Sequence, residues 1–122
     1  MTTLKSYQDL EVWKKSIEWV ERIYLASRSF PPEEKFGLTS QVRRAAVSVV
    51  ANIAEGAART GTGEFLQSLS VASGSLAEVE TLLILAGRMQ LMPASETQQL
   101  LEEAAELSKM LGGLKRSLRS RS

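Results

Sequence analysis

The chain has 122 residues, of which 43% are hydrophobic and 24% are charged, and this suits one globular domain with a core of its own. It contains no cysteine and no histidine, so disulfides, thiolate metal sites and imidazole chemistry are excluded. The net charge of +1 is unevenly distributed, because residues 1–59 carry +2, residues 60–106 carry −6 and residues 107–122 carry +5. The basic end can attract an anionic partner or complement the dipole at a helix C-terminus.

The N-terminal segment MTTLKSYQDLEVW has no apolar signal core. No stretch approaches the roughly 20 apolar residues of a membrane span. We therefore expect a soluble, cytoplasmic protein that has no membrane partner.

The first helix is predicted over residues 6–29. Its apolar residues recur every three or four positions and define one core-facing seam: Leu10, Trp13, Ile17, Val20 and Tyr24. Trp19 lies beside this seam and is a candidate for a subunit contact. Pro31-Pro32 ends the helix, because proline has no amide hydrogen and disfavours a helical conformation in the residue before it. We expect Phe30 and Phe36, which bracket this turn, to close the end of the core.

The second helix, predicted over residues 33–58, has two apolar faces rather than one. The first face consists of Leu38, Val42, Ala45, Val49 and Ile53. The second face consists of Val47, Val50, Ala54 and Ala57. A helix that is apolar over most of its circumference is buried on more than one side, and a chain this short has few helices to cover it. We therefore predict that Val47, Val50 and Ala54 contact another copy of the chain.

A line of polar side chains separates these two faces, and the third helix carries a second polar set. We interpret the following residues as a hydrogen-bond network that fixes the helix register or the subunit interface: Gln41, Ser48, Asn52, Glu55, Ser75, Glu78 and Thr81. Within it, Arg44 or Arg59 is placed to pair with Glu78 or Glu55. The alternative is an anion or RNA-phosphate site. Its candidate residues are Arg43, Arg44 and Arg59, with Lys115, Arg116, Arg119 and Arg121 of the C-terminal tail.

The third helix, predicted over residues 63–90, has the longest seam: Phe65, Leu69, Ala72, Leu76, Val79, Leu83 and Ala86. Gly74 in its middle costs about 1 kcal/mol relative to alanine, which predicts the close approach of a neighbouring helix. The fourth helix, predicted over residues 94–118, has the seam Leu100, Ala104, Leu107, Leu111, Leu114 and Leu118. Gly112-Gly113 should weaken its last turns, and a basic tail follows over residues 115–122.

Four amphipathic helices joined by short turns predict an all-α fold. We expect residues 1–122 to form a single domain, an antiparallel up-down-up-down four-helix bundle.

We do not expect an enzyme. Carboxylate bundles that hold two metal ions use Glu-x-x-His motifs, and histidine is absent here. Glu55 and Glu78 are the most attractive pair of acids for acid–base chemistry. We assign no catalytic, cofactor-binding or metal-binding residues, and we expect neither a cofactor nor a small-molecule substrate. Trp13 and Trp19 are possible base-stacking residues, but packing explains a tryptophan on a core seam better.

The polar and glycine positions also match a known pattern. The matching segments are LEVWKKS from Leu10, FPPEEKFGL from Phe30, QVRRAAVSVVANIAEGAAR from Gln41, GEF from Gly63, and ASGSLAEVET from Ala72. Together they make the chain resemble the bacterial four-helix bundle family of 23S rRNA intervening-sequence proteins over most of residues 7–90.

The resemblance implies a homopentamer of four-helix bundles around a central axis. This suggests a non-catalytic scaffold that acts by binding another macromolecule. The fold is also similar to that of the accessory variability determinant protein of diversity-generating retroelements, which binds nucleic acid and partners a reverse transcriptase. The resemblance therefore implies, as an alternative, an accessory protein whose partner is RNA or a nucleic-acid-processing protein.

Overall fold

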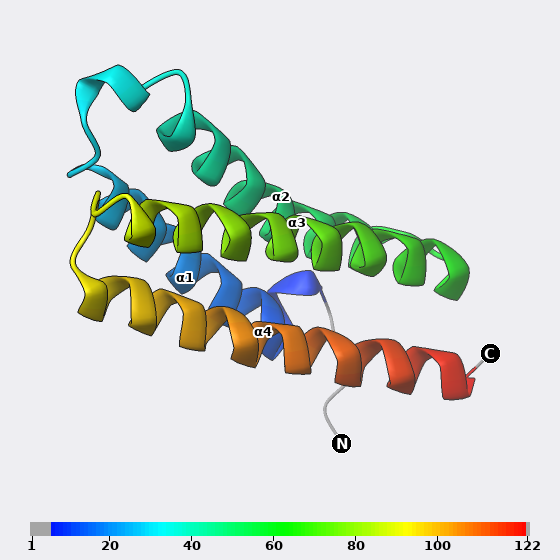
Figure 1. Cartoon of the computed structure of the whole chain (residues 1–122). Helices are drawn as coiled ribbons and strands as arrows, with labels where there is room; N and C mark the ends of the chain where they lie inside the picture. The colour runs from blue at the N-terminus through cyan, green and yellow to red at the C-terminus, as the bar shows by residue number, and fades with distance from the viewer. Residues whose placement is uncertain (1–5, 122) are drawn as a thin grey trace.

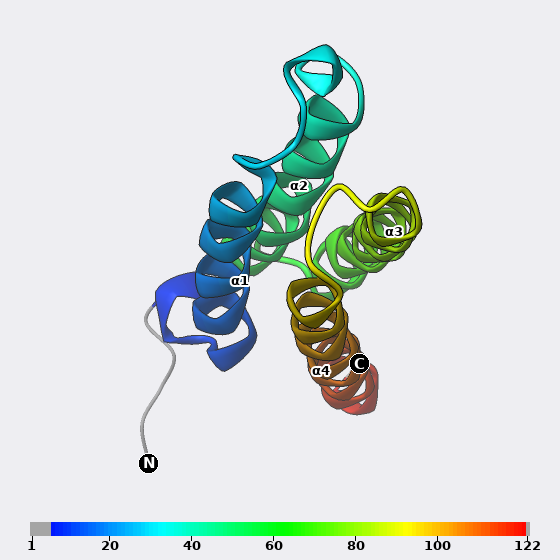
Figure 2. The same cartoon turned by 60° about the vertical axis from the view of Figure 1, so that its left-hand side comes forward.

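The computed structural model describes residues 6–121, and within this range the chain forms four α-helices, two 3-10 turns and no strand. The elements are η1 (Tyr7–Asp9), α1 (Glu11–Ser27), η2 (Pro32–Glu34), α2 (Leu38–Ala58), α3 (Thr62–Arg88) and α4 (Ala94–Arg121). Successive helices run in opposite directions (Figure 1). Seen from nearer the helix ends, α1 and α3 lie on opposite sides, with α2 and α4 between them (Figure 2). The prediction of an all-α four-helix fold is confirmed.

The helices α2 and α3 approach each other closely at Gly56, where α2 meets the start of α3. A Cβ atom on Gly56 would lie 2.7 Å from Cβ of Ser68, so a larger residue would force the helices apart. Gly74 has no such role, because nothing lies within 4 Å of the position its Cβ would occupy. The prediction that Gly74 marks a close approach within the chain is therefore wrong.

The seams predicted for α2, α3 and α4 form the core. The buried residues from them are Leu38, Val42, Ala45, Val49, Ile53, Leu69, Ala72, Leu76, Val79, Leu83, Ala86, Leu100, Ala104, Leu107, Leu111 and Leu118. Phe65 and Leu114 are partly buried against this cluster. Each of these helices therefore faces the core with the stripe that its periodicity indicated.

The seam predicted for the first helix is correct at Leu10, which is buried just before α1 begins, and wrong within α1. Its buried residues are Val12, Ser16, Trp19, Ile23 and Ser27, whereas Trp13, Ile17 and Val20 are half-buried and Tyr24 is exposed. The hydroxyl of Ser16 donates to the carbonyl oxygen of Val12 at 2.6 Å, and that of Ser27 donates to the carbonyl oxygen of Tyr24 at 3.2 Å. Both serines are satisfied within their own helix, which allows polar residues to occupy core positions.

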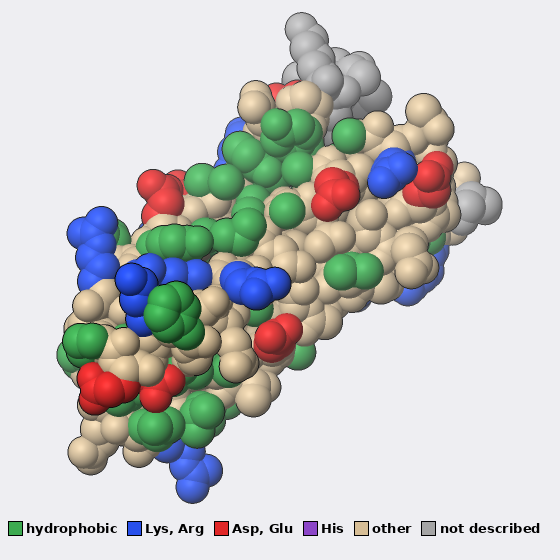
Figure 3. Space-filling model, turned by 90° about the horizontal axis from the view of Figure 1, so that it is seen from above, with side chains coloured by type: hydrophobic (Ala, Val, Ile, Leu, Met, Phe, Trp, Pro, Cys, Tyr) green, Lys and Arg blue, Asp and Glu red, His purple; other side chains and the backbone are tan. Residues whose placement is uncertain are grey.

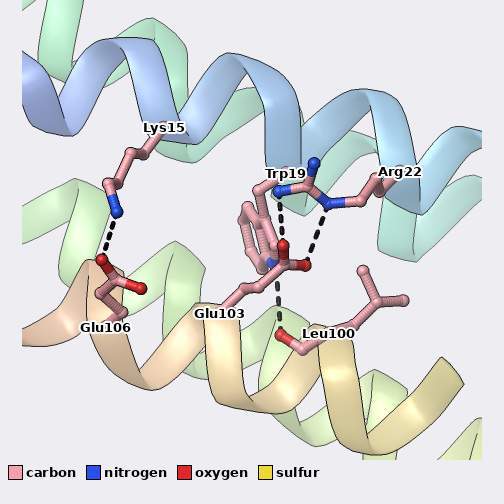
Figure 4. A network of polar contacts seen from close by, with 6 residues as sticks. All are labelled: Lys15, Trp19, Arg22, Leu100, Glu103 and Glu106. Atoms are coloured by element: carbon pink, nitrogen blue, oxygen red, sulfur yellow. Dashed lines mark hydrogen bonds and ion pairs between the residues drawn. The ribbon is translucent and has the colours of Figure 1, made fainter. Parts of the chain in front are cut away.

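Trp19 lies at the centre of the contact between α1 and α4 (Figure 4). Its side chain is fully buried, and its indole Nε1 donates to the carbonyl oxygen of Leu100 at 3.2 Å. The expectation that Trp19 contacts another subunit is therefore wrong, because its own chain covers it.

Two ion pairs flank Trp19 (Figure 4). Arg22 Nε lies 3.1 Å from Glu103 Oε1, and Lys15 pairs with Glu106. The hydrogen bond from Lys15 to the Glu106 carboxylate, together with its negative charge, raises the pKa of Lys15. Pairs as exposed as these contribute little to stability, so buried side chains such as Trp19 attach α1 to α4 more strongly than the ion pairs do.

The corner before α2 differs from the prediction of a helix over residues 33–58. Pro32–Glu34 forms a separate turn, and α2 begins at Leu38, whose amide nitrogen donates to the Glu34 carboxylate at 3.0 Å. Phe30 is buried as expected, but Phe36 is 88% exposed and does not close the core. The corner therefore holds an aromatic ring out in solvent.

At the other end of the chain, α4 continues through Gly112-Gly113 to Arg121. The prediction of a helix ending at residue 118 with a separate tail is therefore wrong for the described residues up to 121. Leu118 is buried, which explains why the helix continues.

Replacing Leu107 by alanine tests the α4 seam. This side chain is only 2% exposed, so Leu107→Ala should lower the free energy of unfolding by about 2–5 kcal/mol, because it removes buried apolar surface and leaves a cavity. Denaturant unfolding followed by circular dichroism measures the loss. Leu25→Ala, at an exposed position, is the control and should change the free energy of unfolding by less than about 0.5 kcal/mol. A loss below about 1 kcal/mol for Leu107→Ala would contradict the assigned core.

Candidate interaction surfaces

Three of the seven residues predicted to form a polar network are joined by hydrogen bonds. The hydroxyl oxygens of Ser48 and Ser75 lie 2.8 Å apart across α2 and α3. Asn52 Nδ2 donates to the Ser48 carbonyl oxygen at 2.8 Å and to its hydroxyl oxygen at 3.1 Å. Thr81 instead donates to the Ala77 carbonyl oxygen within α3. The network links α2 to α3 at one level of the bundle.

Two of the remaining members, Gln41 and Glu78, line an open cleft between α2 and α3. The cleft has a volume of about 420 Å³ and is lined by Phe36, Ser40, Gln41, Arg44, Ala45, Ser48, Ser75 and Glu78. Arg44 and Glu78 are exposed, and neither makes a hydrogen bond or ion pair with any other residue between 6 and 121. Glu55 is also exposed. The expected pairing of Arg44 with Glu78 or Glu55 is not formed, so these charges remain available to a partner.

The candidate phosphate-binding arginines do not share one surface. Arg43 donates from Nε to the Ser27 hydroxyl at 2.8 Å and from a terminal nitrogen to the Tyr24 carbonyl oxygen at 3.2 Å. Its guanidinium carbon also lies 4.8 Å from the centre of the Tyr24 ring. Arg43 thus caps the C-terminal end of α1. Arg59, at the opposite end of α2, lies 4.0 Å from Glu64.

The basic residues of the C-terminal segment form a separate group at the end of α4. Lys115 donates to the Ser73 hydroxyl at 2.6 Å, which fixes this part of α4 against α3. The group's exposed members in the described range are Arg116, Arg119 and Arg121. Arg43 and Arg44 lie about 15 residues before the end of α2, so roughly 20 Å of helix separates them from this end of the bundle. One phosphate group therefore cannot contact both groups.

Hydrophobic side chains gather on the face formed by α1 and α2 (Figure 3). We call this face the α1–α2 band; it consists of Trp13, Ile17, Val20 and Tyr24 from α1 and Val47, Val50 and Ala54 from α2. Val47 is 42% exposed, Ala54 is half-buried and Val50 is buried. Basic side chains cluster at the η2 end of this face (Figure 3). The chain thus covers part of the second apolar face of α2 and leaves the rest in solvent.

A second apolar face, which the sequence analysis missed, lies on α3. We call it the α3 outer face; its residues are Val71, Gly74, Ala77, Thr81, Ile84, Leu85 and Met89, all exposed. Val71, Ile84, Leu85 and Met89 have exposures of 44% to 50%. The seam of α3 accounted for its strongest periodicity, and these apolar residues lie away from it. The sequence signal that could have revealed this face is the set of apolar residues on the side of α3 opposite its core seam.

Among the described residues, α3 is also the one helix with the length and composition of a membrane span. Its most apolar window of 18 residues has a mean hydropathy of 1.5, and 33% of that window is buried in the bundle. On these criteria the expectation that no stretch approaches a membrane span is wrong for α3. Core helices of soluble proteins meet the same criteria, and seven α3 residues are buried in the bundle. The unusual feature is that so apolar a helix is covered on one side only.

The described residues contain no group of three or more acidic side chains that could hold a metal ion.

These features can be compared with known proteins. Residues 8–113 match the model of the family described as 23S rRNA-intervening sequence protein. The chain belongs to this family. The match extends into α4, beyond the segments that carried the resemblance in the sequence.

A solved structure has the same fold. It is that of a protein of unknown function from the S23 ribosomal protein family of Bacteroides thetaiotaomicron, with 24% sequence identity and a TM-score of 0.77. The similarity covers 85% of this chain and 97% of the other. At 24% identity, this similarity demonstrates the fold of the present chain. It carries no information about the activity of the chain. No curated protein matches the chain.

A double-mutant cycle tests the serine pair. Ser48→Ala and Ser75→Ala each remove one partner of the 2.8 Å contact, so the two changes should be non-additive by about 0.5–1.5 kcal/mol in the free energy of unfolding. Denaturant unfolding of the two single variants and the double variant gives this coupling. Ser108→Ala, at an exposed position on α4, serves as the control partner and should add to Ser48→Ala without coupling. Additive effects of the two serine changes would mean that the hydroxyls do not interact.

Proposed function

We propose that this protein is a non-catalytic scaffold that assembles with copies of itself in the cytoplasm and acts by binding another macromolecule. The expected assembly is a pentamer. The observation that carries the proposal is the presence of two exposed apolar faces, the α1–α2 band and the α3 outer face, on a domain of only 122 residues.

Contiguous apolar patches are rare on monomeric soluble proteins and usually mark an interaction site. Covering apolar surface contributes about 25 cal/mol per Å², so both faces favour association. The α3 outer face has side chains such as Ile84 and Leu85 with no polar group to interact with water.

The proposal includes no catalytic role. Glu55 and Glu78, the acids best suited by spacing to acid–base chemistry, are both exposed. Enzymes gain from excluding water around catalytic charges, and these two carboxylates are solvated.

Light scattering after size exclusion tests the assembly. The chain has a mass of 13.4 kDa, and at micromolar concentration we expect a particle of several times that mass. A particle of 13.4 kDa under these conditions would overturn the proposal.

A substitution on the α1–α2 band links the assembly to this face. Val47→Glu should shift the particle toward the monomer, because it places a charge in an apolar contact. Helicity measured by circular dichroism should not change, since Val47 is outside the core cluster. The matched control is Leu25→Glu, which changes a more exposed apolar residue on the α1–α4 side and should leave the particle mass unaltered.

RNA binding is a second candidate function, favoured by the corner between η2 and α2. Phe36 is 88% exposed there, and Lys35 Nζ lies 5.4 Å from the centre of its ring. Arg44 lines the cleft beside Phe36. An exposed ring offers a stacking surface for a base, and cations contact phosphates.

A filter-binding assay with single-stranded RNA tests this candidate. Binding at 50 mM salt should weaken steeply as salt rises, because cations on the protein displace counterions from the phosphates. Phe36→Ala and Arg44→Ala should each weaken it. Arg116→Ala with Arg121→Ala tests the C-terminal group without removing the buried Leu118. Absent or salt-independent binding would rule out this function.

A further inference from the structure

We infer that the cleft between α2 and α3 binds a guanine nucleotide of single-stranded RNA, with Phe36 against the face of the base, Glu78 at its Watson–Crick edge and Arg44 at a phosphate. This inference rests on the second candidate function, RNA binding. It adds a preference for one base and a role for Glu78, neither of which RNA binding by itself requires.

The cleft has room for a base and its phosphate. Its volume of about 420 Å³ lies within the roughly 300–1,000 Å³ of sites that hold small ligands. Ser48 is the last residue of α2 that lines the cleft, and its hydroxyl contact with Ser75 joins the two helices at that end. Because α3 runs back toward η2 (Figure 1), Glu78 lies about 4.5 Å closer to Phe36 along the bundle than Ser75 does. The ring and the carboxylate therefore lie toward the same end of the cleft.

Two opposite charges line this cleft without pairing. Arg44 and Glu78 are exposed, and neither makes an ion pair or hydrogen bond with another residue in the described part of the chain. Inorganic phosphate would be repelled by Glu78, and a basic side chain of another protein would be repelled by Arg44 and Lys35. A ligand that has both an anionic group and an uncharged edge of hydrogen-bond donors satisfies both charges. A nucleotide has this combination.

The aromatic ring beside the cleft supplies affinity for a base but no preference among bases. Phe36 is 88% exposed, and Lys35 Nζ lies over its ring at 5.4 Å from the centre. All four bases have a flat face that stacks on such a ring. Lys35 and Arg44 attract phosphates, which are the same in every nucleotide. Any preference must therefore come from the other polar side chains of the cleft.

Glu78 favours guanine because a carboxylate only accepts hydrogen bonds. Guanine presents two neighbouring donors on its Watson–Crick edge, N1–H and the N2 amino group, which match the two oxygens of a carboxylate. Adenine and cytosine each present one donor beside an acceptor nitrogen, and uracil presents one donor between two carbonyl oxygens. Proteins that read single-stranded RNA contact this edge of the unpaired base. The exposed carboxylate of Glu78 is thus placed to distinguish guanine from the other three bases.

Fluorescence anisotropy with labelled RNA tests the preference. One probe is an oligouridine of about 12 nucleotides, and the second has a single guanine at its centre. At about 50 mM salt, the guanine probe should bind about tenfold more tightly, because a bidentate contact discriminates against the wrong base. A third probe has inosine in place of guanine. Inosine lacks only the N2 amino group, so most of the preference should be lost.

Glu78→Gln assigns the preference to this side chain. The amide keeps one acceptor oxygen and loses the other, so the preference for guanine should fall below about twofold. Binding of the oligouridine should not weaken, because the variant keeps Phe36 and Arg44. Glu55→Gln is the matched control, since it removes the same charge from an exposed position of α2 outside the cleft and should keep the preference. Circular dichroism of both variants should show unchanged helicity.

The outcomes separate this inference from RNA binding itself. Salt-dependent binding of both probes without a preference for guanine, or a preference that survives Glu78→Gln, overturns the inference and leaves RNA binding standing. No binding of either probe overturns both. Guanosine monophosphate is added as a competitor, and we expect it to displace the guanine probe only at much higher concentration than the unlabelled RNA. Equal potency of the mononucleotide would overturn the assignment to RNA and indicate a site for a free nucleotide.

Discussion

The helix α3 has more apolar surface than the other three helices of the same chain can bury, and the rest of the structure depends on this constraint. The helix packs its seam into the core with residues such as Leu76 and Leu83, which are only 2% exposed. On the opposite side it places Ile84 and Leu85, which are 48% and 44% exposed. Burial of the seam holds the bundle together, while the uncovered side favours further association. The fold and the proposed assembly therefore derive from the same hydrophobic effect.

Periodicity was sufficient to predict the helices and three of their four core faces, because no polar residue interrupts the first apolar face of α2 or the seams of α3 and α4. It was insufficient for α1, which has two overlapping stripes. One contains Trp13 and the other contains Trp19, and the second stripe is interrupted by Ser16 and Ser27. Counting apolar residues favoured the uninterrupted stripe. The serine hydroxyls, bonded within the helix, remove most of the cost of burying the second stripe, and a sequence pattern does not display those bonds.

The candidate surfaces were only partly predictable for a related reason. Ser48 and Ser75 were predicted to belong to one polar network between α2 and α3, and the structure joins them. Gly74 was recognised as unusual, but the sequence cannot say whether the space beside a glycine is filled by the same chain. Phe36 was expected to close the end of the core because it brackets the Pro31-Pro32 turn together with Phe30. The cap that Glu34 makes on Leu38 orients this corner differently, and such a contact depends on geometry that residue spacing does not specify.

The attachment of α1 has a further consequence for local stability. Beside the buried indole of Trp19, its contact with α4 includes two ion pairs near the surface, and α1 meets α2 and α4 less extensively than α2 and α3 meet each other. Helices held by few buried contacts open locally before the whole domain unfolds. Detachment of α1 would expose its buried Trp19 and Ile23 to solvent. A neighbouring copy that packs against α1 would reduce this local opening and slow the exchange of the α1 amide hydrogens. The rigidity of α1 would therefore increase with the degree of assembly.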